Sequence, residues 1–178
     1  MEEDHYLQYM NNIGPSEMET LIMRYWKDIW NYAYILTKKH DVADDLAQDT
    51  FVNAFLSLGQ FRGESSVKTW LLRICRNLVI NYKRSAFFRR VLPVAAVKPT
   101  LRAASAEHVA IANTQVDVIW QHLLSLPEKH REVIVLDIRY GLSISEMAEF
   151  LGIVEGTVKS RLHRARATMK KAMEENEA

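Results

Sequence analysis

The sequence predicts an all-α protein made of two small helical domains joined by a flexible linker. Apolar residues recur three or four positions apart along most of the 178 residues, and no stretch alternates as a strand would. Glycine and proline, which interrupt helices, number only six and four. The helical period weakens between residues 85 and 113, where Pro93 and Pro99 occur, so we place the junction between the domains there.

Four segments follow from this pattern. We expect a mobile tail over residues 1–15 and a first helical domain over residues 16–92. A linker is expected over residues 93–113, and a second helical domain over residues 114–175.

The first two helices of the first domain are marked by their apolar faces. The first begins near Ser16, because Glu17 and Glu19 suit the positive end of a helix dipole. Its apolar face consists of Leu21, Tyr25, Ile29, Tyr32 and Leu36. The second covers residues 41–58, and its apolar positions are Leu46, Phe51, Ala54, Phe55 and Leu58.

A third helix is predicted from Val67 to about Arg84, after a loop over residues 59–66. Its buried stripe is expected to be Val67, Trp70, Leu71, Ile74, Leu78 and Tyr82. At about 100° per residue, the opposite side carries a polar, cationic strip of Thr69, Arg73, Arg76, Asn77, Lys83 and Arg84. With the aromatic and small polar residues of the loop before it, this strip could accept an unstacked base. A solvated basic helix face is the simpler alternative.

The second domain begins with a helix whose apolar positions are Val116, Ile119, Trp120 and Leu123. Ser125 is expected to cap the next helix, with Pro127 and Glu128 in its first turn. The apolar side of that helix carries Val133, Ile134 and Ile138.

A helix-turn-helix completes the second domain. Met147, Ala148 and Leu151 belong to its first helix, which Gly152 ends in a left-handed turn. The second helix has an apolar side of Val158, Leu162, Ala165 and Met169. Residues 153–171 contain six lysines or arginines against one acid, Glu155, which suits a recognition helix in a DNA major groove. An ordinary helical hairpin with a solvated basic face is the alternative.

Charge is distributed unevenly along the chain, although the net charge is only +1. Residues 62–90 hold eight lysines or arginines and one acid, Glu64, whereas residues 41–49 hold four aspartates and no base. Together with the basic helix near the C-terminus, this gives two separate basic regions, as expected of a protein that contacts nucleic acid twice.

Composition argues against several other classes of protein. No apolar run reaches the roughly 18 residues of a transmembrane helix, and the acidic N-terminus lacks a signal peptide's apolar core, so we expect a cytoplasmic protein without membrane insertion. The single cysteine, Cys75, excludes an internal disulfide and is expected to be a small buried residue. Scattered histidines, and the lack of a glycine-rich phosphate loop or nucleophile elbow, predict no enzyme activity, cofactor or metal site.

Five motifs occur in a characteristic order. They are DDLAQDTF at residues 44–51, FRGESSVKTWL at 61–71, ICRNL at 74–78, LP at 126–127 and GTVKSRL at 156–162. In this combination the chain resembles the extracytoplasmic-function sigma factors of the sigma-70 superfamily, over about residues 16–174. The resemblance implies that it binds core RNA polymerase and directs it to promoters, and that an anti-sigma factor controls it. A dimeric helix-turn-helix repressor or activator is the alternative, but it leaves the acidic helix and the second basic face without a role.

The resemblance also implies roles for individual residues. The helix that docks on the polymerase corresponds to Asp45, Leu46, Gln48, Asp49 and Phe51. The loop that captures a flipped base of the opened −10 element corresponds to Phe61, Arg62, Gly63, Glu64 and Ser65. Asn77 helps to read the same element, and the phosphates of the opened strand are held by Arg73, Arg76, Lys83 and Arg84.

The recognition helix is expected to read the −35 element as duplex DNA. The positions that face the groove correspond to Thr157, Lys159, Ser160, His163 and Arg164. Of these, Lys159 and Arg164 can bond guanine O6 and N7. Arg161 and Arg166 lie nearer the core and are assigned to phosphates. Where Val154 stands, the family often has proline, so we expect the start of this helix to be a little looser here.

Overall fold

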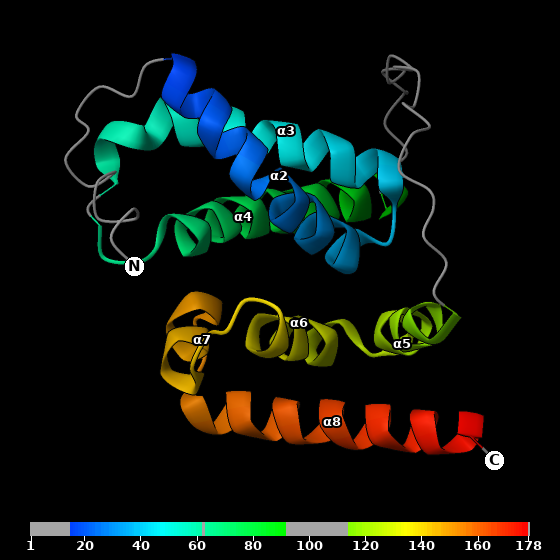
Figure 1. Cartoon of the computed structure of the whole chain (residues 1–178). Helices are drawn as coiled ribbons and strands as arrows, with labels where there is room; N and C mark the ends of the chain where they lie inside the picture. Colours follow the sequence, from blue (N-terminus) through cyan, green and yellow to red (C-terminus); the bar gives the residue numbers. More distant parts are fainter. Residues whose placement is uncertain (1–14, 62, 92–113, 178) are drawn as a thin grey trace. The chain divides into compact units, whose positions relative to one another are not determined.

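The computed structural model describes residues 15–61, 63–91 and 114–177. They form helices without any strand, and they divide into two units, as the predicted fold class requires (Figure 1). The predicted tail, apart from Pro15, and the predicted linker lie outside the described residues. The exact domain boundaries therefore stay a prediction.

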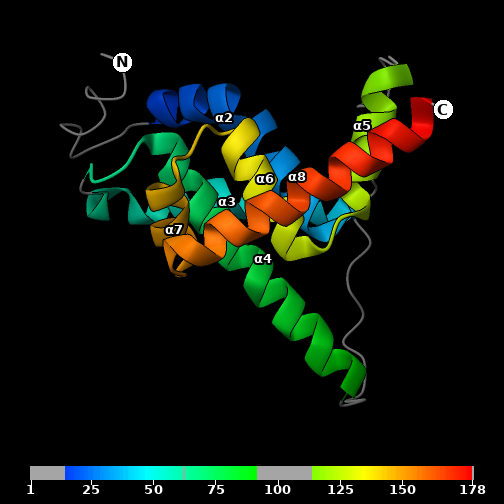
Figure 2. The same cartoon turned by 90° about the horizontal axis from the view of Figure 1, so that it is seen from below.

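The first unit contains α2 (Pro15–Thr37), α3 (His40–Ser57), a short 3-10 turn η2 (Leu58–Gln60) and α4 (Val67–Val91). Each of the three α-helices contacts the other two. The predicted apolar face of α2 is confirmed, because all five of its residues are buried. Figure 2 shows that the C-terminal part of α4 extends beyond α2 and α3.

One prediction about α3 needs correction. The helix runs to Ser57, within one residue of the end predicted near Leu58, and Leu58 begins η2. Phe55 was expected on the apolar face, but it is 51% exposed, because the buried face runs through Leu46, Ala47 and Ala54.

The predicted buried stripe of α4 is also partly wrong. The centre of its buried face is Leu71, Leu72, Cys75 and Val79, all at most 1% exposed. The predicted stripe residues Trp70, Ile74, Leu78 and Tyr82 are only half-buried. Since α4 packs against both α2 and α3, its buried face is centred between these two neighbours. The helix also continues to Val91, beyond the expected end at Arg84.

Cys75 lies in this core, as predicted, and its Sγ is 3.9 Å from the Ile29 carbonyl oxygen. Burial raises the pKa of the Cys75 thiol to about 12, although the hydrogen bond with Thr50 acts in the opposite direction. At pH 8.5 the folded thiol should therefore resist a thiol reagent, whereas a denatured chain, with an ordinary pKa of about 8.5, should react fully. A colorimetric thiol assay with and without denaturant measures this; fast reaction in the folded state would contradict the buried position.

The second unit contains α5 (Thr114–Ser125), α6 (Glu128–Ile138), α7 (Ile144–Leu151) and α8 (Glu155–Glu177). The long helix α8 contacts the other three. The core of the second unit includes Val133, Ile134, Met147, Val158 and Leu162. Burial of Met147, Val158 and Leu162 confirms the predicted apolar sides of α7 and α8 at these positions.

Three predictions in this unit fail, two of them at the ends of helices. Ser125 does not cap α6: its hydroxyl donates to the His122 carbonyl, so it closes α5, and Pro127 precedes α6 without a side-chain cap. Ile138, at the last position of α6, is 74% exposed. Ile119, in the middle of α5, is 44% exposed.

Arg131 is a buried charged residue of α6 that the sequence did not reveal. It is only 3% exposed. Its Nη1 donates to the carbonyl oxygens of Leu124 at 2.9 Å and Leu126 at 3.0 Å, at the end of α5. The guanidinium therefore satisfies carbonyls that have no partner within the helix, and it joins α6 to α5.

Candidate nucleic-acid interface

The turn between α7 and α8 has the predicted left-handed glycine. Gly152 adopts φ 67° and ψ 40°, its N–H donates to the Glu149 carbonyl at 3.3 Å, and the Ile153 N–H donates to the Ala148 carbonyl at 3.0 Å. A residue with a Cβ is strained in this conformation. Gly152 therefore fixes where α7 ends and where α8 can begin.

The start of α8 is held by the carbonyl of Val154, which accepts from the N–H groups of Thr157 at 2.9 Å and Val158 at 3.3 Å. Val158, Leu162 and Ala165 are at most 4% exposed and face the core. Because these positions fall on one side of the helix, the opposite side of α8 faces outward.

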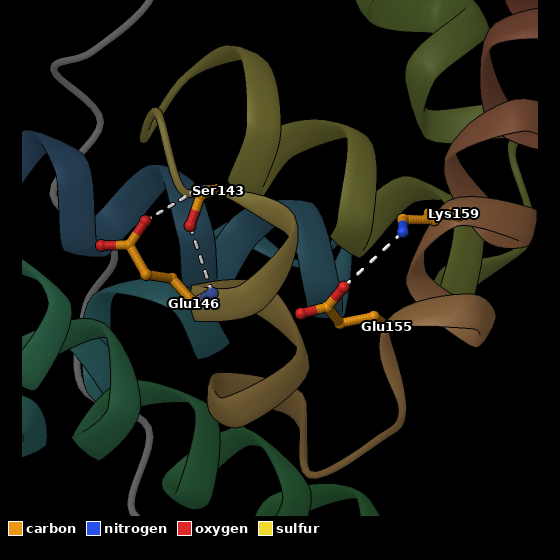
Figure 3. Close-up of polar contacts among 4 residues, drawn as sticks. All are labelled: Ser143, Glu146, Glu155 and Lys159. Atoms are coloured by element: carbon orange, nitrogen blue, oxygen red, sulfur yellow. Dashed lines mark hydrogen bonds and ion pairs between the residues drawn. The ribbon is translucent and has the colours of Figure 1, made fainter.

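The outward side of α8 carries the residues predicted to face the groove. Lys159, Ser160, His163 and Arg164 are exposed, and Thr157 is half-buried. Lys159 Nζ lies 3.6 Å from Glu155 Oε2 one turn earlier (Figure 3). The Ser160 hydroxyl donates to the Thr157 carbonyl at 3.0 Å, which leaves its oxygen able to accept.

The two arginines assigned to phosphates have different surroundings. Arg161 is half-buried, beside the core residue Leu162. The guanidinium of Arg166 lies 2.6 Å from Asp137 Oδ2 of α6, a partner that the sequence did not reveal. Arg166 thus fixes α8 against α6, and a phosphate contact would have to share this guanidinium with Asp137.

A capping box begins α7, the helix before the turn. The Ser143 hydroxyl accepts from the Glu146 N–H at 3.3 Å, and Glu146 Oε2 accepts from the Ser143 N–H at 2.8 Å (Figure 3). Two N–H groups at the helix start are thereby satisfied. Hydrogen bonding from the Ser143 side chain, and then from its backbone, holds the pKa of Glu146 below its ordinary value.

Replacing Ser143 by alanine should lower the free energy of unfolding by about 1 kcal/mol at pH 7. Because the folded pKa of Glu146 is depressed, the stabilisation from its ionised form is present above the ordinary pKa of about 4.3 and is lost as the pH falls through the folded pKa. The penalty should therefore shrink below about pH 4. Denaturant unfolding of both chains between pH 3 and pH 7 tests this, and a penalty that does not change with pH would contradict it.

The loop before α4 has a defined conformation around Gly63, which adopts φ 70°. Phe61 and Ser65 are half-buried and Glu64 is exposed, while Arg62 lies outside the described residues. The Ser66 hydroxyl accepts from the Thr69 N–H at 3.1 Å and so ties the end of the loop to the first turn of α4.

Phe61 packs against Trp70, with ring centroids 5.0 Å apart and planes tilted by 44°. Trp70 was predicted in the buried stripe, but it is half-exposed beside the loop. If the buried face of α4 is taken to be centred on Cys75, at about 100° per residue, Trp70 falls on the opposite side of the helix, with Arg73 and Asn77. The structure therefore adds an aromatic residue to the polar strip of α4.

The rest of that strip agrees with the prediction in part. Asn77 and Arg84 are exposed, whereas Thr69, Arg73, Arg76 and Lys83 are half-buried. Ile80, on the same side of the helix, is 38% exposed. The strip therefore combines cations and an amide with apolar surface.

The predicted docking residues on α3 separate into two groups. Asp45, Gln48 and Asp49 are exposed, whereas Leu46 and Phe51 are 6% and 4% exposed. These two apolar residues hold α3 in the core and do not reach the surface. The neighbouring Asp44 is not free on this surface, because its Oδ1 accepts a hydrogen bond from the Trp30 indole N–H.

Sequence reasoning missed the apolar part of the same α3 surface. Val52, Phe55 and Leu56 are 56%, 51% and 75% exposed, one or two turns beyond the exposed aspartates. Their signal was their position opposite Ala47 and Ala54, which are fully buried. We call Asp45, Gln48, Asp49, Val52 and Leu56 the α3 face.

Nowhere in the part of the chain that the structure describes do three His, Cys, Asp or Glu side chains come together as a metal ion would require. Among those residues, no helix has the length and apolar character needed to span a bilayer.

Comparisons with known proteins agree with the division of the chain into two units. Residues 21–87 match the family model of sigma-70 region 2, and residues 117–169 match that of sigma-70 region 4. RNA polymerase sigma factor YlaC of Bacillus subtilis is 34% identical over 158 residues, which cover 88% of this chain and 91% of that protein. ECF RNA polymerase sigma factor SigM of Mycobacterium tuberculosis is 32% identical over 151 residues, covering 85% and 74%.

Two solved structures are also similar. The sigma factor RpoE of Bartonella quintana, in complex with the anti-sigma factor NepR, has a TM-score of 0.69 at 26% identity, covering 89% of this chain and 97% of that one. CnrH, in complex with the cytosolic domain of CnrY, has a TM-score of 0.66 at 26% identity, covering 96% and 97%. Sigma factors are transcription initiation factors and not enzymes. With both sigma regions present in order, this chain belongs to the extracytoplasmic-function branch of the sigma-70 family of RNA polymerase sigma factors.

Proposed function

We propose that this sigma factor docks on core RNA polymerase through the α3 face, reads the −35 element as duplex DNA with α8, and holds the opened −10 strand with the loop before α4 and the strip of α4. The observation that carries the proposal is that the outward side of α8 and the polar part of the α3 face are exposed opposite a closed core, while the loop and strip of α4 are exposed in part, at Glu64, Asn77 and Arg84. The place of action is the cytoplasm, where the polymerase transcribes.

The outward side of α8 supports the reading of duplex DNA. Lys159 and Arg164 offer donors to guanine O6 and N7, the Ser160 oxygen can accept, and the His163 ring can donate or accept. All four side chains are exposed on a helix that follows the turn of a helix-turn-helix. Phosphate contacts from the flanking arginines would add affinity without sequence information.

The surroundings of Phe61 support the capture of an opened strand. Phe61 and Trp70 together present aromatic surface, and bases stack on such surface whatever their sequence. The exposed Asn77 amide can pair with a base edge, and Arg84 lies two turns further along α4 as a phosphate contact. Duplex binding alone would need none of these groups.

Control by an anti-sigma factor is the third part of the proposal. One similar solved structure is a complex with the anti-sigma factor NepR, and the other is a complex of CnrH with the cytosolic domain of CnrY. In this chain the exposed apolar residues of the α3 face, Val52 and Leu56, form a surface that a partner protein could bury favourably. An anti-sigma protein bound there would exclude the polymerase.

The first experiment mixes the purified chain with core RNA polymerase and measures a one-to-one complex by size exclusion. Run-off transcription from a pool of genomic fragments then identifies its promoters. Binding of specific duplex DNA by the chain alone, without a polymerase complex, would contradict the proposed function.

The opened-strand part needs its own test. On a promoter fragment mismatched across the −10 element, Phe61→Ala should weaken holoenzyme binding about tenfold, because base stacking contributes about 1–3 kcal/mol. Binding to a duplex carrying only the −35 element should not change. An equal loss on both fragments would place Phe61 in the structural core and not in the −10 site.

A further inference from the structure

Glu155 is the one acidic residue between positions 153 and 171, where six cations give the helix its affinity for DNA. It is the first residue of α8, and the N-terminal residues of a recognition helix are those that contact base edges. A carboxylate at this place repels the phosphates of any DNA that binds. Its presence therefore needs a reason.

Favourable interaction with the helix dipole is one such reason, because an acid in the first turn stabilises a helix. A second reason lies in its partner. Glu155 Oε2 and Lys159 Nζ are 3.6 Å apart, and the two side chains remain 51% and 60% exposed (Figure 3). An acceptor and a donor are thus held side by side on the outward surface of α8, without being buried against the protein.

This spacing corresponds to the major-groove edge of one C·G base pair. Cytosine N4 offers a donor there, and guanine O6 and N7 offer acceptors beside it. N4 and O6 are themselves joined by a hydrogen bond of about 3 Å, so the two groups lie nearly as far apart as the carboxylate and the ammonium. An A·T pair also places a donor, adenine N6, beside an acceptor, thymine O4, but only the C·G pair has a second acceptor, guanine N7, next to the first, so that one ammonium can bond both.

The neighbouring residue leaves room for such an approach. Gly156 does not have the positive φ that would require glycine, and a Cβ added there would meet no atom within 4 Å. The fold itself therefore does not need a glycine at this position, although glycine weakens a helix relative to alanine. Without a side chain at Gly156, the surface beside Glu155 is open to a close partner.

From this geometry we infer that the Glu155–Lys159 pair reads a single C·G base pair of the −35 element. The Glu155 carboxylate accepts from the cytosine N4 amine, and the Lys159 ammonium donates to guanine O6 or N7. Glu155 then lowers affinity for DNA in general and raises selectivity at one position. The inference rests on the proposed function, since it refines how α8 reads its element.

The test selects −35 sequences from a randomised duplex library with holoenzyme containing the full chain, followed by sequencing. Glu155→Ala removes the acceptor and should reduce the preference for cytosine at one position about tenfold, within the range of a specific base contact. Lys159→Ala removes the donor and should reduce the preference at the same position. Glu174→Ala is the matched control, because Glu174 pairs with Lys170 on the same helix at the same 3.6 Å, and it should leave every position unchanged.

Different failures point to different causes. If Glu155→Ala changes binding to all sequences by one common factor, or if Glu155→Ala and Lys159→Ala affect different positions, the inference is wrong and the pair only adjusts charge. If the unchanged holoenzyme selects no upstream sequence, the proposed function itself is wrong, and the inference fails with it.

Discussion

Replacing Asp49 by lysine and Leu56 by alanine in one chain should abolish the complex with core RNA polymerase. Both side chains lie on the α3 face, and Leu56 is 75% exposed, so neither contributes to the core. Centrally placed interface residues commonly contribute about 2 kcal/mol or more each, so affinity should fall more than about 100-fold. The free energy of unfolding should stay within about 0.5 kcal/mol of the original, as for most surface substitutions.

Fluorescence titration of labelled chain with core polymerase measures the affinity, and denaturant unfolding measures the stability. Glu174→Lys makes the same change of charge on α8 and should bind normally, which excludes a general charge effect. Leu46→Ala is an unsuitable probe, because this residue is 6% exposed and the loss of its side chain would cost about 2–5 kcal/mol of stability. Retained binding by the double variant would show that the docking surface lies elsewhere.

Replacing Arg164 by alanine should remove reading of the −35 element at one position while leaving the polymerase complex intact. Arg164 is exposed on the outward side of α8, and the loss of a bidentate contact to guanine costs about 1–3 kcal/mol of discrimination. Promoter binding should therefore weaken between about 5-fold and 150-fold, and only for sequences with the preferred base.

Arg166→Ala provides the comparison on the same helix. Arg166 pairs with Asp137 at 2.6 Å, so its removal should lower the stability of the second unit by up to about 1 kcal/mol. Because a phosphate contact carries no sequence information, any loss of DNA affinity should be equal for all sequences. Competition binding with matched and mismatched promoters separates the two arginines; an equal pattern for both would contradict the assignment of Arg164 to a base.

The sequence predicted most where the large apolar residues themselves form the centre of the buried face. In α2 every predicted core residue is buried, and Gly152 ends α7 where its backbone freedom is required. In α4 the same reasoning failed, because the large ring of Trp70 lies at the edge of the buried face, while the smaller Cys75 and Val79 lie at its centre. A hydrophobicity pattern indicates a helical period, but it does not reveal which residues lie at the centre of the buried face.

The candidate surfaces show a similar limit. The exposed groove residues of α8 could be predicted, because they lie opposite a clear apolar side. The pair of Arg166 with Asp137 could not, since it joins residues 29 positions apart whose proximity depends on how α6 packs. The apolar part of the α3 face was missed for a related reason: Val52 and Leu56 look like core residues until the partner helices are in place.

Arg131 has a consequence for how this protein can be divided. Among the described residues, its guanidinium donates hydrogen bonds to the carbonyls of Leu124 and Leu126 at the end of α5, at 2.9 and 3.0 Å. A fragment that starts at α6 would keep a positive charge inside the fold with those acceptors removed, which costs several kcal/mol. A fragment of the second unit should therefore be stable only if it begins before Leu124, so that both carbonyls stay with Arg131.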